Sequence, residues 1–345
     1  GVETTICLPK TAWPPTWQVS AGAALRIAGA TLLAGAVARA LLFALGSGLG
    51  APAPASDPRP ANVAAWTPDA PTQSWDAPLV VVDRRGVVQR ALNVERPWTP
   101  RFSPDGRRVA YGAFADGRGS SDVFVTDLEQ GTTRRLTDDD GDSNDPQWSP
   151  DGRTVAFSVG APGGKDIFAT PLSGGPAKPL ASRNGTQFAS DWVRDGRTLV
   201  VTDDGEGHGQ DVYAVPLDGS PARRIAASDA DESAARVSPD GRWVVYTSNV
   251  SGQPELYLDS FTRPGRPVAV TRGGGQHAVW RADGRELFFW RDGVLVSMPV
   301  EPSSTAVPPD LGAPTSLFKG PYPGGFNTMY DVSPDGQRFV IVRGQ

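Results

Sequence analysis

The chain has 345 residues, and its 33 Lys or Arg against 38 Asp or Glu give a formal net charge of −5 at pH 7. This acidic balance argues against nucleic-acid binding as the main function. With one cysteine and two histidines, the chain has no internal disulfide framework and no cysteine-rich zinc site, and we expect no cofactor. The 40 glycines and 33 prolines favour many short elements joined by turns over an all-helical fold.

Composition divides the first 77 residues into three segments. Residues 1–20 have no clear periodicity, and we expect an irregular segment there. Residues 21–49 are almost wholly apolar and long enough for a transmembrane helix, which needs about 20 such residues. Arg39 near the middle of that span would cost about 2.5–3.5 kcal/mol, so a soluble Ala-rich helix or poorly ordered chain is the alternative. Residues 50–77 are rich in Pro and Ala and are typical of a semi-rigid linker.

From residue 78 onward, a repeated Ser-Pro-Asp-Gly sequence predicts a series of tight turns. Proline presets φ at the second turn position, and glycine accepts a positive φ at the fourth. Two further copies keep only the Asp-Gly pair. The intervals between successive Asp-Gly aspartates are 43 to 52 residues, and these aspartates are Asp105, Asp151, Asp195, Asp240, Asp283 and Asp335.

Short apolar runs surround each of these turns. In the first repeat, residues 108–111 follow the turn, residues 122–125 form a third run and residues 135–137 a weaker fourth. Four antiparallel strands in about 44 residues are typical of one β-propeller blade. The sixth repeat lacks its last two strands, and residues 79–83 and 87–92 have the missing pattern. We therefore predict an all-β fold: a six-bladed β-propeller of four-stranded antiparallel blades over residues 78–345. The N-terminal strands would close it by pairing with the last blade, and the apolar helix would precede it.

The repeats resemble those of TolB-like (WD40-like) propellers. The similarity rests on turns such as residues 148–152 (WSPDG), on the following residues 155–157 (VAF), and on residues 166–168 (DIF). A narrower resemblance, carried by residues 79–86 and 330–342, is to the C-terminal propeller of bacterial receptor-like Ser/Thr protein kinases. It implies an extracytoplasmic, periplasmic propeller that residues 21–49 anchor to a membrane. The sequence has no kinase motif, so kinase activity would lie on sequence that is not present here.

Several functions are compatible with this pattern. The sequence has no Gly-x-Ser-x-Gly nucleophile elbow, and we expect a non-catalytic binding module rather than an enzyme. The main hypothesis is the extracytoplasmic sensor or protein-interaction module of a membrane-anchored bacterial protein. The alternatives are a TolB-like periplasmic envelope or transport component and a metal-dependent propeller hydrolase. The acidic residues 138–145 lack EF-hand spacing, so we expect no metal site there.

The central mouth of the propeller is the expected binding site for a protein or a small ligand, because loops from several blades converge there. When the repeats are aligned on Asp-Gly, polar residues recur four and six positions before the aspartate. Ordinary strand-start residues with local partners are the alternative interpretation. The expected ligand-binding residues are Arg101, Asp145, Gln147, Asp191, Arg236, His277 and Asp331.

Overall fold

The structure is a computed structural model that describes residues 78–343, except for 115–119, 139–140, 162–163, 184, 205–208, 227, 302, 304–306, 321 and 323–326. Every regular element in these ranges is a β-strand. The expected irregular segment 1–20, transmembrane helix 21–49 and linker 50–77 lie outside the described residues. Within the described ranges, no helix is suited to crossing a membrane.

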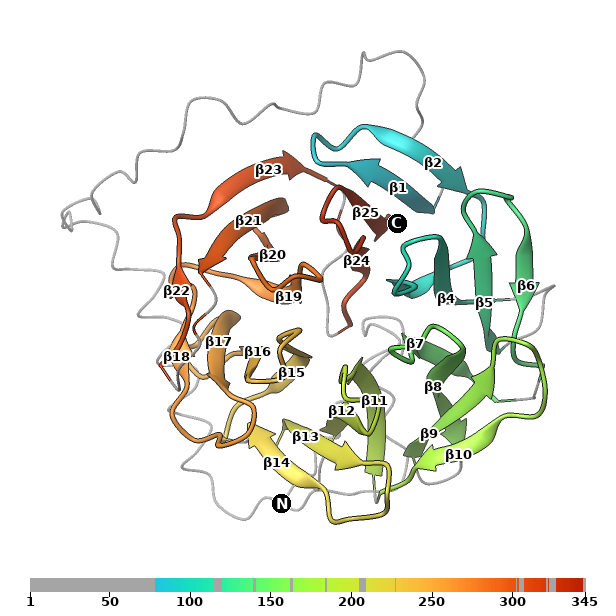
Figure 1. Ribbon diagram of the computed structural model, residues 1–345, viewed down its shortest axis with the longest axis horizontal. Coiled ribbons are helices and arrows are strands. Elements are labelled where there is room, and N and C mark those ends of the chain that lie inside the picture. Colours follow the sequence, from blue (N-terminus) through green and yellow to red (C-terminus); the bar gives the residue numbers. More distant parts are fainter. Residues whose placement is uncertain are drawn as a thin grey trace, which may run out of the picture. The chain divides into compact units, whose positions relative to one another are not determined.

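The first sheet joins strands from both ends of the described chain (Figure 1). Its order is β2-β1-β25-β24, and its strands are β1 (Leu79–Asp83), β2 (Val88–Leu92), β24 (Tyr330–Val332) and β25 (Arg338–Val342). β1 pairs antiparallel with β25, from Leu79 opposite Val342 to Asp83 opposite Arg338. This pairing is the closure predicted from the sequence, and it leaves neither terminal strand as an open edge.

Three more sheets lie around the same central axis in Figure 1. One contains β3 (Trp98–Phe102), β4 (Arg108–Phe114), β5 (Ser121–Asp127) and β6 (Thr133–Arg135). Another contains β15 (Glu232–Val237), β16 (Trp243–Ser248), β17 (Glu255–Ser260) and β18 (Val268–Ala269). The third has five strands, which are β19 (Gln276–Trp280), β20 (Glu286–Arg291), β21 (Val294–Glu301), β22 (Asp310–Leu311) and β23 (Thr315–Lys319).

The largest sheet has eight strands, in two antiparallel halves. The first half contains β7 (Ser143–Trp148), β8 (Thr154–Ala161), β9 (Gly164–Pro171) and β10 (Lys178–Ala181). The second contains β11 (Gly185–Trp192), β12 (Thr198–Asp204), β13 (Gln210–Pro216) and β14 (Arg223–Ala226). β9 and β11 join the halves through parallel pairing of Gly164 with Gly185 and of Lys165 with Thr186.

The prediction of six separate four-stranded antiparallel blades is therefore wrong. The described strands form five sheets, of which three have four strands, and one sheet contains a parallel pair. The parallel pair forms where two backbones approach closely. Gly164 has a φ of 147°, and a Cβ on it would lie 2.0 Å from the carbonyl oxygen of Gly185. Only glycine permits this approach, and the repeat pattern carries no sign of it.

Each Ser-Pro-Asp-Gly turn is held by its own serine. In the first one, the N–H of Gly106 donates to the carbonyl oxygen of Ser103 at 2.8 Å. The Ser103 hydroxyl accepts a hydrogen bond from the N–H of Arg108 at 3.0 Å and donates to Asp105. Gly106 has a φ of 69°, a conformation that side-chain-bearing residues adopt at a cost. The other intact copies repeat this pattern, so the turn sets where each second strand begins.

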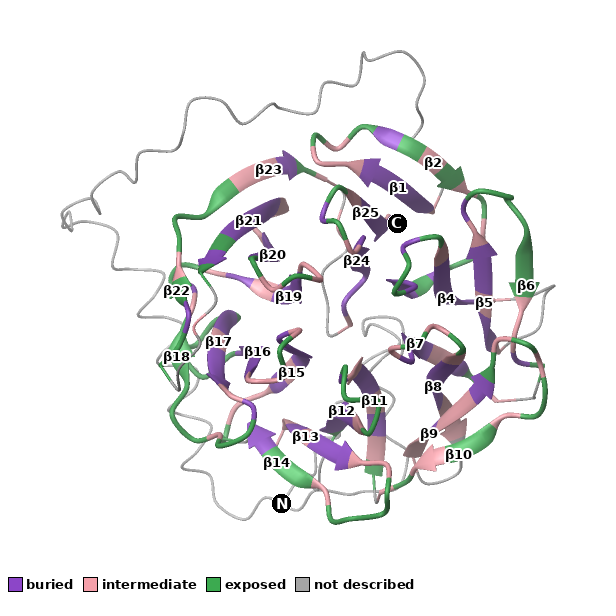
Figure 2. Cartoon of the chain, in the orientation of Figure 1, coloured by how far each residue is buried: buried purple, intermediate pink, exposed green. Residues whose placement is uncertain are grey.

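The core lies between neighbouring sheets, where Figure 2 shows mostly buried strand residues. Between β20 and β25, the rings of Phe288 and Phe339 meet edge to face with their centres 5.2 Å apart, and both are fully buried. Burial of each such side chain stabilises the fold by roughly 1.5–3 kcal/mol. The sheets thus form a rigid frame for the residues near the axis.

Candidate binding site at the central channel

The innermost strands carry a repeated backbone irregularity near the axis. Four non-glycine residues, each six positions before an Asp-Gly aspartate, have φ values of 40° to 57°: Thr99, Asp145, Ala234 and His277. In each strand, the register of pairing with the next strand shifts at this point. Such a bulge bends the strand and redirects the side chains that follow it. Because left-handed φ values are unfavourable for residues with a side chain, their clustering marks the channel as a constrained region.

A cavity of about 510 Å³ opens on the side of the channel that carries the Ser-Pro-Asp-Gly turns. We call it the vestibule. Five of its polar lining residues come from five different innermost strands, and we call these five the vestibule floor: Arg101, Gln147, Asp191, Arg236 and Asp331. Turn prolines and three indoles provide much of its wall: Pro104, Pro150, Pro239, Pro334, Trp148, Trp192 and Trp280. The structure therefore brings five of the seven expected site residues together.

Arg101 is buried and bonded to main-chain oxygens. Its Nη1 donates to the carbonyl oxygens of Pro100 at 2.7 Å and Thr328 at 3.0 Å. Burial and, to a smaller extent, the positive charge of Arg236 lower the pKa of the Arg101 guanidinium to about 9. Arg101 thus retains its charge at neutral pH, in surroundings that disfavour that charge.

Arg236 connects two other members of the polar lining. Its Nη1 donates to Gln147 Oε1 at 3.1 Å and lies 3.8 Å from Asp191 Oδ1. Gln147 in turn donates from Nε2 to the carbonyl oxygen of Ala189 at 3.0 Å. The side chains of β7, β11 and β15 are therefore linked across the vestibule floor.

Two aspartates bind the backbone of the neighbouring innermost strand. Asp191 Oδ2 accepts a hydrogen bond from the N–H of Val237, and Asp331 Oδ2 accepts one from the N–H of Phe102, both at 2.8 Å. Burial raises the pKa of both carboxyls, while the positive charges of Arg236 and Arg101 oppose that rise. These contacts orient the floor and join adjacent sheets.

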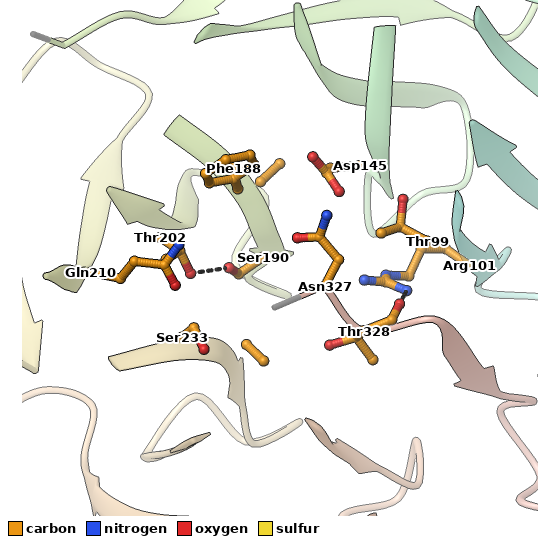
Figure 3. A pocket seen from close by; sticks show the side chains of 12 residues that line it. Thr99, Arg101, Asp145, Phe188, Ser190, Thr202, Gln210, Ser233, Asn327 and Thr328 are labelled. Atoms are coloured by element: carbon orange, nitrogen blue, oxygen red, sulfur yellow. Dashed lines mark hydrogen bonds between the residues drawn. The ribbon is translucent and has the colours of Figure 1, made fainter. Parts of the chain in front are cut away.

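Asp145 lies apart from the vestibule, in the small polar pocket of about 20 Å³ that Figure 3 shows. Arg101 lines both spaces, and Asn327 and Thr328 lie near it in the small pocket (Figure 3). Burial raises the pKa of the Asp145 carboxyl, against the opposing charges of Lys165 and Arg101. This pocket holds about one water molecule, so it is too small for a side chain of a partner.

The structure places His277 in the packing of the sheet rather than at either cavity. It is 1% exposed, and its Nδ1 lies 2.8 Å from the Tyr322 hydroxyl. The Tyr322 hydroxyl also accepts a hydrogen bond from the N–H of Met329 at 3.1 Å. The backbone N–H of His277 donates to Thr247 Oγ1 at 3.0 Å. His277 therefore does not join the other expected site residues at the vestibule.

Three indoles of the vestibule wall are not among the site residues predicted from the sequence. Trp148 Nε1 donates to the carbonyl oxygen of Arg101 at 3.0 Å, and Trp280 Nε1 donates to that of Arg236 at 3.2 Å. Trp192 Nε1 has no hydrogen-bond partner among the described residues. All three directly precede the residue at the turn's first position, which is the only sequence signal that distinguishes them. In the described ranges, no group of three or more His, Cys, Asp or Glu residues could hold a metal ion.

Two curated proteins are similar to short stretches of the chain. The uncharacterized peptidase YuxL of Bacillus subtilis is 35% identical over 71 residues, which cover 18% of this chain and 11% of that protein. The Tol-Pal system protein TolB of Alcanivorax borkumensis is 32% identical over 65 residues, which cover 19% of this chain and 15% of that protein. The chain thus matches less than a sixth of the length of either relative.

Solved structures of similar fold include a putative TolB from Agrobacterium tumefaciens, with a TM-score of 0.61 and 20% identity over 77% of this chain and 96% of that one. TolB from Acinetobacter baumannii has a TM-score of 0.54 and 17% identity over 70% of this chain and 66% of that one. The TolB-like resemblance predicted from the sequence is confirmed, whereas these matches do not show the narrower similarity to receptor kinases. The family of the TolB beta propeller domain matches residues 68–242, just over half of the chain, and the chain belongs to this family.

Proposed function

We propose that the chain is a non-catalytic, protein-binding propeller of the TolB type that acts in the periplasm and receives a segment of its partner in the vestibule. The observation that carries this proposal is the convergence of polar side chains from five strands on one cavity with a wall of indoles and prolines. Such a cavity offers large apolar contact area around a few fixed polar groups, as protein-binding hot spots do.

The rigidity of the vestibule supports binding further. Proline and tryptophan lose little conformational freedom on binding, and two of the three indoles are already held by main-chain hydrogen bonds. The floor residues are likewise fixed to neighbouring strands. A partner segment would therefore meet a preformed surface, which lowers the entropic cost of association.

The relatives favour one of the functions considered above. A curated relative is named a Tol-Pal system protein, which supports a periplasmic envelope component over a receptor-kinase sensor. A membrane anchor at residues 21–49 stays a prediction. The hydrolase alternative has little support in the vestibule, where no histidine or cysteine is part of the described lining.

Obstruction of the vestibule tests the proposal. The full chain, carrying an affinity tag, is expressed in the periplasm, and co-purified proteins are identified by mass spectrometry. Ala282 lines the vestibule, so Ala282→Trp should reduce recovery of the specific partner at least tenfold. Val268 on β18 is 49% exposed at an outer strand, so Val268→Trp adds the same indole away from the vestibule.

The control should retain the partner at the wild-type level. Equal recovery with both variants, or equal loss with both, would contradict binding at the vestibule. Circular dichroism of the purified variants verifies that each is folded.

A further inference from the structure

Arg236 has an incomplete set of hydrogen bonds. The residue is 7% exposed, and Nη1 is bonded to Gln147. Its Nε and Nη2 are buried and have no hydrogen-bond partner among the described residues. Buried guanidinium donors without acceptors are unfavourable, and in native proteins they point to a missing acceptor.

The aspartates of the vestibule do not supply that acceptor. Asp191 approaches Arg236 at 3.8 Å through Nη1, which is already bonded. Its Oδ2 is committed to the N–H of Val237. Asp331 is committed in the same way to the N–H of Phe102. Both carboxylates therefore accept hydrogen bonds from backbone N–H groups. Neither accepts one from Nε or Nη2 of Arg236.

The net charge of the vestibule lining also favours an anion. Three arginines line the vestibule, namely Arg101, Arg194 and Arg236, against the two aspartates. Arg101 bonds neutral carbonyl oxygens rather than a carboxylate. The formal charge of the described lining is therefore +1, with the two buried cations at its floor.

We propose that the partner segment presents a carboxylate to Arg236, with one oxygen accepting from Nε and the other from Nη2. These two donors lie on the same edge of the guanidinium, and their spacing matches a carboxylate in a bidentate pair. The group is an Asp or Glu side chain or a C-terminal carboxylate. This inference rests on the proposed function, because it assumes that a peptide enters the vestibule.

The experiment uses two peptides that differ only in this group. N-acetyl-triglycine carries a C-terminal carboxylate, and its C-terminal amide is the neutral counterpart. Each is titrated into the ¹⁵N-labelled full chain while the arginine Nε–H and tryptophan indole N–H resonances are followed. The acid should shift the Arg236 Nε–H resonance and the Trp192 indole resonance in a saturable way, and the amide should bind at least tenfold more weakly.

Two variants locate the contact. Arg236→Gln should weaken binding of the acid at least tenfold, whereas Arg263→Gln, which removes an exposed arginine that is not part of the vestibule lining, should leave it unchanged. The wild-type titration does not depend on the folding of either variant. Inorganic phosphate is titrated in parallel, and tighter binding of phosphate than of the acid would overturn a carboxylate-specific site.

Other outcomes also contradict the inference. Equal binding of acid and amide, or an unmoved Arg236 resonance at saturating acid, would mean that water rather than a ligand completes the guanidinium. Such a result leaves the obstruction experiment with Ala282→Trp unaffected. If obstruction instead leaves partner recovery unchanged while the acid still binds Arg236, the proposed function fails and the carboxylate site stands.

Discussion

Asp331 in β24 and Phe102 in β3 are joined by a 2.8 Å hydrogen bond from the Phe102 N–H to Asp331 Oδ2, across 229 residues of sequence. The bond links the sheet that contains both β1 and β25 to the sheet formed by β3, β4, β5 and β6. Asp191 and Val237 repeat the relationship between β11 and β15. The same residues that give the vestibule its charge therefore also hold its strands together.

Removal of the Asp331 carboxylate should destabilise the fold. In Asp331→Ala, the buried Phe102 N–H loses its acceptor, and the free energy of unfolding should fall by about 1–3 kcal/mol. Asp331→Asn keeps a carbonyl oxygen in place and should lose much less at pH 7. Urea denaturation of both variants measures the difference, and equal losses would mean that the hydrogen bond contributes nothing.

The pH dependence of stability should differ in sign between floor and turn aspartates. Burial raises the folded-state pKa of Asp331, opposed by Arg101 and Arg236. Its contribution to stability is therefore complete below the unfolded pKa of about 3.9 and is lost as the pH rises through the folded value. Relative to the wild type, Asp331→Asn should become more stable as the pH rises.

Asp151 in a turn provides the opposite case. The Ser149 hydroxyl and the Arg153 N–H hold the pKa of its carboxyl below the ordinary value. This contribution is present above the unfolded pKa and is lost as the pH falls through the folded value. Asp151→Asn should therefore become less stable than the wild type as the pH rises. Urea midpoints between about pH 3.5 and 7 measure both trends, and parallel curves for the two variants would refute the assignment.

Gly164 should not tolerate a side chain. A Cβ would lie 2.0 Å from the Gly185 carbonyl oxygen, so Gly164→Ala should separate β9 from β11 and cost about 2–4 kcal/mol. Gly175 also has a left-handed φ, of 130°, but no atom lies within 4 Å of its Cβ position. Gly175→Ala should thus cost only the backbone strain, about 1 kcal/mol. Thermal unfolding compares the two, and similar losses would argue against the parallel pairing.

The vestibule indoles should differ in their contribution to stability. Trp148→Phe leaves the buried carbonyl oxygen of Arg101 without its donor and should cost about 1–3 kcal/mol. Trp192→Phe removes an N–H that has no partner among the described residues, so it should cost clearly less. Urea denaturation distinguishes them. A larger loss for Trp192→Phe would contradict the hydrogen-bond assignment at these indoles.

The repeat predicts the strands well because its turn is held locally. Ser103, Asp105 and Gly106 make their contacts within six residues, so the pattern is visible in the sequence. The pairing of β1 with β25 was also predictable, because the missing strands of the last repeat had to come from the other end. By contrast, the β9–β11 junction depends on a backbone approach at Gly164, and glycines are too common in this chain to mark it.

The site was predictable only in part, for a similar reason. The common offset before Asp-Gly identified the five polar residues of the vestibule, since equivalent positions of innermost strands face the same axis. The alignment also selected His277, whose Nδ1 is hydrogen-bonded to the hydroxyl of Tyr322 in a distant loop. Asp145 lies only two positions before the vestibule residue Gln147 in the same strand, and it lines the small pocket instead.

Site-specific photo-cross-linking tests the central claim most directly. The photoreactive amino acid p-benzoylphenylalanine is placed at Ala282 in the vestibule or at exposed Val268 on β18, and the full chain is irradiated in living cells. A partner held in the vestibule predicts a discrete adduct from position 282 and none from position 268. An adduct of the same partner from position 268 alone would contradict the account.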